Sequence, residues 1–126
     1  MSPLFRKSEE KVAREAAVMA EIDRLKALSV DDMAVALLPA LGPDGVNKGQ
    51  SVRVQELCNY LLKDCPDAGQ LKPLQLTPPV NRGLEKLKRA EFVYPFAYQR
   101  SPVWRITALG KDALAEGTVE QRVRAA

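Results

Sequence analysis

Histidine is absent from this chain of 126 residues, and its absence excludes a large class of chemistry. His-based catalytic triads, His-ligated metal centres and most general acid–base mechanisms need an imidazole. A phosphate-binding loop is lacking as well, because the segment GPDGVNKGQS at residues 42–51 has glycines without the Walker spacing. We therefore expect that the chain is not an enzyme and that it holds no cofactor.

Cysteine is scarce, with Cys58 and Cys65 as the only two. If both lie on one helix, they are about 10 Å apart along its axis, which is too far for a disulfide. Two thiols without a histidine also make a poor zinc site. We expect two free thiols, buried or half-buried, and no metal site.

Long apolar runs are missing too. The longest are far shorter than a membrane-spanning helix requires. The first residues, MSPLFRKSEEKVAREAA, become charged at once and have no apolar signal-peptide centre. These absences predict a cytoplasmic protein without a membrane partner.

The residues that are present suit one soluble domain with a single core. Hydrophobic residues make up 46% of the chain and charged residues 28%. Residues 1–70 hold nine Lys/Arg and eleven Asp/Glu, whereas residues 71–126 hold ten and five, a net charge of +5. If the chain binds a polyanion, we expect it to bind at this second part.

Residues 8–28 are predicted to form a helix that Ser8 caps. Val18, Ile22 and Leu25 make a narrow apolar stripe along it. Such a stripe packs either on the rest of the domain or on a second copy of the chain. The residues alone leave both alternatives open.

Two more helices are predicted in the first half of the chain. One begins at the N-cap Ser29 and stops at Gly42. The other covers residues 51–65, with Ser51 as its cap. A connector follows at residues 66–76, with a short strand or an extended stretch.

A fourth helix is predicted over residues 77–90, TPPVNRGLEKLKRA, with Thr77 as its N-cap. Gly83 costs roughly 1 kcal/mol in a helix relative to alanine. We expect it to permit close packing on the preceding helix. The apolar stripe consists of three residues at helical spacing: Val80, Leu84 and Leu87.

The pattern then changes, and aromatic and β-branched residues around a QRSP break predict a two-stranded hairpin over residues 92–107. Trp104 shares one face with Ile106 and is predicted to lie in the core. Pro95 indicates a first strand that is short, bulged or at an edge. Three aromatic residues alternate on one face, for core or interface packing or for base stacking: Tyr94, Phe96 and Tyr98.

Residues 107–117 return to a helical pattern, with Leu109 and Leu114 predicted to face inward and Gly117 to end the helix. The tail at residues 118–126 either continues as a helix or frays.

The order of these elements resembles a winged helix-turn-helix. The stretch LTPPVNRGLEKLKRAEFV, residues 76–93, is similar to the recognition-helix segment of regulators of the multiple-antibiotic-resistance repressor type. The stretch VWRITALGKDAL, residues 103–114, resembles the second wing strand and following helix of that superfamily. Glu91 stands where the family usually has glycine. The resemblance covers residues 29–117 and implies an α+β, mostly helical winged helix-turn-helix with an added N-terminal helix.

This resemblance implies sequence-preferring binding of double-stranded DNA by a small transcriptional regulator. The recognition helix 77–90 would enter the major groove, and the wing 92–107 would touch backbone or the minor groove. Asn81 and Arg82 lie in the half of the helix that reads bases, where Asn suits adenine and Arg suits guanine. Residues 77–107 hold six Lys/Arg and two Asp/Glu, a net charge of +4 that favours phosphate contact.

Other side chains are expected to contact phosphate or the minor groove. Thr77 would hold a phosphate at the helix start, and Arg105 is either a backbone contact or an exposed strand residue. Gln99 and Arg100 lie at the predicted hairpin tip. The complete predicted DNA-binding set is Thr77, Asn81, Arg82, Lys86, Lys88, Arg89, Gln99, Arg100 and Arg105.

The predicted organisation has three parts: an N-terminal helix 1–28 for packing or dimerisation, the winged domain 29–117, and the tail 118–126. A homodimer would match a two-fold DNA site. The alternative function is a winged-helix protein–protein interaction module without DNA binding. Glu85 favours that alternative, because a carboxylate in the middle of the helix repels phosphate, and a Lys/Arg-rich helix face is often only a solvated face.

Overall fold

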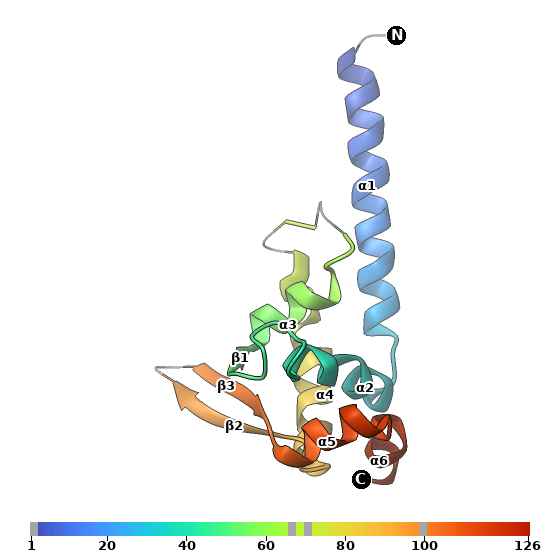
Figure 1. Ribbon diagram of the computed structural model, residues 1–126. Coiled ribbons are helices and arrows are strands. Elements are labelled where there is room, and N and C mark those ends of the chain that lie inside the picture. The colour runs from blue at the N-terminus through green and yellow to red at the C-terminus, as the bar shows by residue number, and fades with distance from the viewer. Residues whose placement is uncertain (1–2, 66–67, 70–71, 99–100) are drawn as a thin grey trace.

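Helices make up most of the structure, and a small antiparallel sheet lies at one side of them (Figure 1). The computed structural model describes residues 3–65, 68–69, 72–98 and 101–126. This confirms the prediction of an α+β, mostly helical fold. The elements in chain order are α1 (Pro3–Lys26), α2 (Val30–Leu41), β1 (Val52–Arg53), α3 (Val54–Leu61), the 3₁₀ helix η1 (Lys72–Leu76), α4 (Thr77–Arg89), β2 (Val93–Tyr98), β3 (Ser101–Ile106), α5 (Ala108–Glu116) and α6 (Val119–Ala125).

Helix α4 contributes the apolar stripe that its sequence predicts. Val80, Leu84 and Leu87 are fully buried, and the helix packs against α2 and α3. Burying one such side chain contributes roughly 1.5–3 kcal/mol. The stripe therefore orients the helix and leaves its opposite side to solvent.

Gly83 lies where α4 meets α2. A Cβ at this position would lie 2.8 Å from Met33 Cγ and 2.9 Å from Leu37 Cδ1. Glycine is therefore needed for the close approach of the two helices. The expectation of close packing holds, but the neighbour is α2 and not the immediately preceding helix.

The sheet has the strand order β1–β3–β2, with both pairs antiparallel. The hairpin pairs without interruption from Val93 with Ile106 to Tyr98 with Ser101. Pro95 therefore stands on an edge strand, as its lack of an N–H predicts. Trp104 and Ile106 are buried in the core, which confirms both predictions for them.

The turn between β3 and α5 is fixed by Thr107. Its Oγ1 accepts from the N–H of Gly110 at 3.1 Å and donates to the carbonyl of Glu91 at 2.6 Å. A Cβ at Gly110 would lie 2.5 Å from the carbonyl oxygen of Phe92. The Thr-x-x-Gly pattern at 107–110 thus holds the start of α5 close to the backbone that leads into β2.

Three of the predicted helix caps are wrong. Helix α1 begins at Pro3, so Ser8 lies inside it. Strand β1 follows Ser51, and the N-cap of α3 is Arg53. Thr77 is the first residue of α4, because η1 runs directly into the helix with Leu76 in the cap position. Residues Lys72–Leu76 are accordingly a 3₁₀ helix and not a strand or an extended stretch.

The predicted cap at Ser29 and the predicted stop at Gly117 are confirmed. Ser29 caps α2, with its Oγ accepting from the N–H of Asp32 at 3.0 Å. Gly117 ends α5 with a φ of 70°, and the tail continues as the helix α6. Leu114 packs partly against the core, but Leu109 is 45% exposed, so its inward prediction is wrong. On α5 it is Gly110 and Ala113 that face the core.

Helix α1 is anchored by its last turns and projects from the rest of the molecule (Figure 1). Val18, Ile22 and Leu25 are buried within the chain, and the helix contacts η1. Side chains at residues 9–17 are all exposed. The stripe therefore packs on the rest of the chain, which is the first of the two alternatives predicted for it. Within the described residues, no helix is long and apolar enough to span a membrane.

Candidate nucleic-acid interface

One side of α4 is open to solvent and carries most of its polar side chains. Asn81, Arg82, Glu85, Lys88 and Arg89 are all exposed, and they lie opposite the buried stripe. We call these five residues the open face of α4. Three of its members are cations and one is a carboxylate, so the face is positive with an acid within it.

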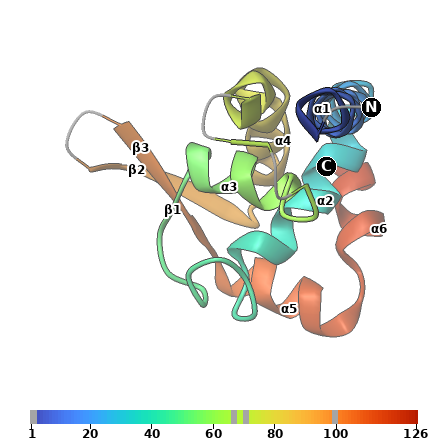
Figure 2. The same ribbon diagram turned by 90° about the horizontal axis from the view of Figure 1, so that it is seen from above.

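The open face lies at an edge of the molecule between two other elements. Seen from above, α4 lies with the β2–β3 hairpin to one side and α1 to the other (Figure 2). Beside it, a hollow of about 280 Å³ is lined by Val30 together with Asn81, Arg82, Glu85 and Arg89. Val30 begins α2 and is 37% exposed. The face is thus accessible over its length, with one apolar side chain at its border.

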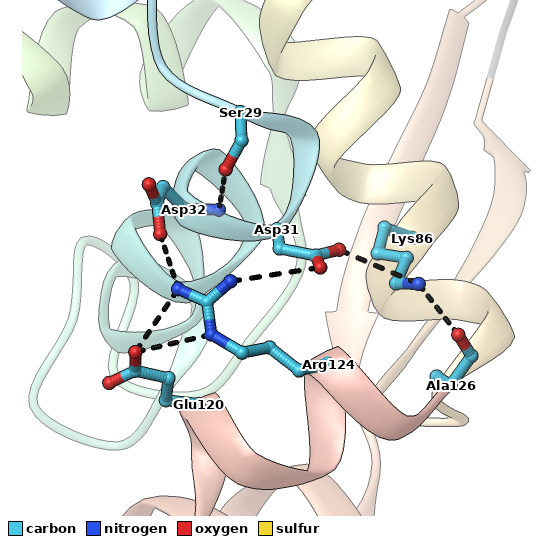
Figure 3. Close-up of polar contacts among 7 residues, drawn as sticks. All are labelled: Ser29, Asp31, Asp32, Lys86, Glu120, Arg124 and Ala126. Carbon is cyan, nitrogen blue, oxygen red and sulfur yellow. Dashed lines mark hydrogen bonds and ion pairs between the residues drawn. The ribbon is translucent and has the colours of Figure 1, made fainter.

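Lys86 is not part of the open face, and its internal contacts do not favour the DNA contact predicted for it. Its Nζ donates to the carbonyl oxygen of Ala126 at 2.6 Å and lies 3.5 Å from Asp31 Oδ1 (Figure 3). The side chain is only 12% exposed. It joins α4 to the start of α2 and to the last residues of the chain, so its charge is already neutralised within the fold.

Arg124 extends the same set of polar contacts. Its guanidinium contacts Asp32 at 2.7 Å and Glu120 at 3.1 Å, and it lies 3.9 Å from Asp31 (Figure 3). The hydrogen bonds to Glu120 and Asp32 raise the pKa of Arg124. Arg122 pairs with Glu116 at 3.1 Å. Several cations of the basic second part are therefore paired internally, and the charge available to a polyanion is smaller than the sequence count suggests.

Thr77 is half-buried and does not stand at a free helix end. Its Oγ1 lies 3.9 Å from Cys58 Sγ, and η1 covers the position before it. The first turn also contains Pro78 and Pro79, which have no N–H to offer. The helix start packs against α3, and its two prolines present no N–H groups, so this geometry does not favour the phosphate contact predicted at Thr77.

The cysteines are free thiols, as predicted, with Cys58 buried and Cys65 half-buried. Burial raises the pKa of the Cys58 thiol, which disfavours the reactive thiolate. No group of three or more His, Cys, Asp or Glu suited to a metal occurs among the described residues. The described part of the chain thus offers neither an activated thiol at Cys58 nor a cluster of metal ligands.

The hairpin carries the remaining predicted contacts. Arg105 is partly exposed, and its Nη2 donates to Gln50 Oε1 at 3.0 Å, which holds it against the loop before β1. Gln99 and Arg100 lie outside the described residues. Tyr94 and Phe96 are 42% and 37% exposed, so the core alternative for these two aromatics is wrong.

Two residues near these surfaces were not predicted from the sequence. Val30 borders the hollow beside α4, and Arg53 lies on the sheet through the pairing of β1 with β3. A strand of two residues leaves no periodicity to detect. The contact of Val30 with the hollow depends on how α2 crosses α4, which local sequence does not encode.

Comparison of the chain with protein-family models, with curated proteins and with solved structures finds no match in any of the three.

Proposed function

We propose that this chain is a small winged-helix DNA-binding protein and a transcriptional regulator, with α4 as the helix that enters the major groove. The sequence of elements supports this proposal, since helices α2, α3 and α4 precede a two-stranded hairpin that pairs with β1 in the order β1–β3–β2. In a winged helix, the helix before the hairpin is the one that reads DNA.

The observation that carries the proposal is the open face of α4. Asn81 and Arg82 lie in the N-terminal half of a helix whose other side is fixed in the core. Both are exposed, and both side chains have the donors that bind base edges in the major groove. Lys88 and Arg89 follow about two turns later and would bind phosphate.

Glu85 fits within this proposal as a base-reading group. A carboxylate repels phosphate, but it accepts a hydrogen bond from the amino group of cytosine. Its position between Arg82 and Arg89 reduces the repulsion. The face then combines the acceptors of Glu85 and Asn81 with several donors, which favours preference for a sequence over uniform binding.

A homodimer on a two-fold site remains a prediction. Its interface does not come from the stripe of Val18, Ile22 and Leu25, because that stripe is buried within the chain. The competing function is a protein-interaction module. Exposed Val30 beside the hollow and Glu85 on the face favour it, since protein partners use apolar contacts more than a DNA backbone does.

Fluorescence anisotropy on fragments selected from genomic DNA tests the proposal. With about four phosphate contacts, affinity should fall roughly 100-fold between 50 and 200 mM salt. Arg82→Ala should weaken binding to a preferred site about 10- to 100-fold and binding to random DNA much less.

Lys111→Ala is a matched control, because Lys111 is an exposed cation on α5. It should leave the affinity nearly unchanged. Equal losses for Arg82→Ala on preferred and random DNA would reject base reading by Arg82. Undetectable DNA binding at low salt would reject the proposal and favour the protein-interaction module.

A further inference from the structure

Besides the open face of α4, the protein has another exposed surface, on the side of the three-stranded sheet that faces away from the core. Cross-strand partners share a face of a sheet, and successive residues alternate between faces. Val52, Trp104, Val93 and Ile106 fall on the buried side. The other side, which we call the outer sheet face, carries Arg53, Val103, Arg105, Tyr94 and Phe96, with Ser101 toward the hairpin tip.

Two aromatic rings lie next to each other on the outer sheet face. The ring centroids of Tyr94 and Phe96 are 6.0 Å apart, with their planes at 32°. Val103 pairs with Phe96 on one side and Arg53 on the other, and it is only 5% exposed although it belongs to this face. The two rings thus lie beside a buried valine, on a hairpin that extends away from the helices (Figure 2).

Both charged members of the outer sheet face are arginines. Arg105 lies across from Tyr94, and Arg53 lies across from Val103. Gln50 holds Arg105 by one hydrogen bond, which leaves most of its five donors for other partners. Among the described residues of this face none is acidic. The carboxylate of Glu56 nearby is occupied by the N–H of Arg53 at 3.1 Å and by Asn47 Nδ2 at 3.0 Å.

We propose that the outer sheet face binds single-stranded nucleic acid. Unpaired bases stack on Tyr94 and Phe96, and the phosphates joining them lie against Arg53 and Arg105. Aromatic rings interleaved with arginines are the combination that binds a single strand without regard to its sequence. In a duplex the faces of the bases are hidden, so stacking selects unpaired nucleotides.

A second copy of the chain suits this face poorly. A two-fold interface places the same patch on both sides, so it would gather the arginines of both copies without a carboxylate of this face to pair them. The proposed strand is polyanionic and matches both the rings and the charges. This site is independent of the open face of α4, so either site can fail without the other.

Anisotropy of a labelled 15-nucleotide poly-dT strand, which does not self-pair, tests the proposal at 50 mM salt. Tyr94→Ala and Phe96→Ala should each weaken binding roughly 10- to 100-fold. Tyr94→Phe keeps the ring and should stay within about threefold of the wild type. Arg105→Ala should weaken binding and lower the dependence on salt.

Leu74→Ala is the matched control, because Leu74 on η1 is 42% exposed, like Tyr94, and lies off the sheet. It should leave dT binding unchanged. Arg82→Ala should reduce duplex binding only, which separates the two sites. The proposal is overturned if dT is not bound, or if folded Tyr94→Ala, checked by circular dichroism, binds it like the wild type. It is overturned equally if Tyr94→Ala alters only self-association in sedimentation, which would make the face a protein interface.

Discussion

At residue 91 the backbone turns from α4 into β2 with a φ of 64°, the left-handed conformation. Side chains with a Cβ reach this region at a cost of roughly 1–2 kcal/mol. The position is nevertheless fixed, because the carbonyl of Glu91 accepts from Thr107 Oγ1 and the N–H of Phe92 donates to Leu87 at 3.0 Å. The turn thus needs a conformation for which glycine is better suited than glutamate.

Glu91→Gly is accordingly expected to stabilise the protein by about 0.5–1 kcal/mol. Relief of the left-handed strain exceeds the extra chain entropy that glycine adds to the unfolded state. Urea denaturation measures the change. Glu91→Ala removes the same charge but keeps a Cβ, so it should give no stabilisation. Equal gains for both variants would mean that the charge, and not the backbone, decides the effect.

The residues of α4 differ in how far the sequence alone predicts their place in the candidate interface. Helical periodicity correctly separated Asn81, Arg82, Lys88 and Arg89 from the buried stripe. It gave no sign that Lys86 pairs with Asp31 and Ala126, because those partners are distant in the chain. Spacing along one helix identifies the exposed side, whereas long-range neighbours decide which charges on it are free.

At the scale of elements, the close approach of α2 and α4 at Gly83 constrains the position of the candidate interface. Gly83→Ala should destabilise the protein by about 1–2 kcal/mol, although helix propensity alone predicts a gain of roughly 1 kcal/mol. The added methyl would press on Met33 and Leu37 and come within 3.3 Å of the backbone nitrogen of Ala34. Chemical denaturation of the variant gives the sign directly.

A double-mutant cycle provides the control. In a Met33→Ala background one of the opposing side chains is shortened, so the cost of Gly83→Ala should shrink. An unchanged cost in that background would place the strain elsewhere. A stabilising Gly83→Ala would mean that α2 shifts without loss, and the close approach would then not define the interface.

Long elements with periodic apolar residues were predictable from the sequence. Short elements, and boundaries that depend on tertiary contacts, were not. The hairpin, the N-cap at Ser29 and the stop at Gly117 follow from local chemistry. Strand β1 has two residues and exists only through pairing with β3. Thr77 has a good cap side chain, yet η1 continues into α4 and removes the need for a cap.

For the molecule as a whole, the contacts around Lys86 and Arg124 hold α2, α4 and α6 together and are not part of the candidate interface. Lys86→Gln should lower stability by about 1 kcal/mol, because a hydrogen bond to Ala126 and an ion pair with Asp31 are lost. Its effect on DNA affinity should stay below about twofold, since the group does not reach the interface.

Arg82→Gln serves as the reciprocal variant. It should leave the urea midpoint nearly unchanged, because Arg82 is exposed, and should weaken DNA binding. Both variants are compared at a temperature at which each is fully folded. A loss of affinity in Lys86→Gln with unchanged stability would return Lys86 to the contact surface.

The projecting turns of α1 are the segment where we expect a protease to cleave first. Residues 9–17 have no buried side chain, so this segment contributes nothing to the core, and helices shorter than about 12–15 residues are marginal alone. Local fraying there leaves the anchored turns intact. Brief trypsin treatment should therefore cut first after Lys11, and mass spectrometry should find a trimmed chain that still carries Val18, Ile22 and Leu25 and unfolds cooperatively.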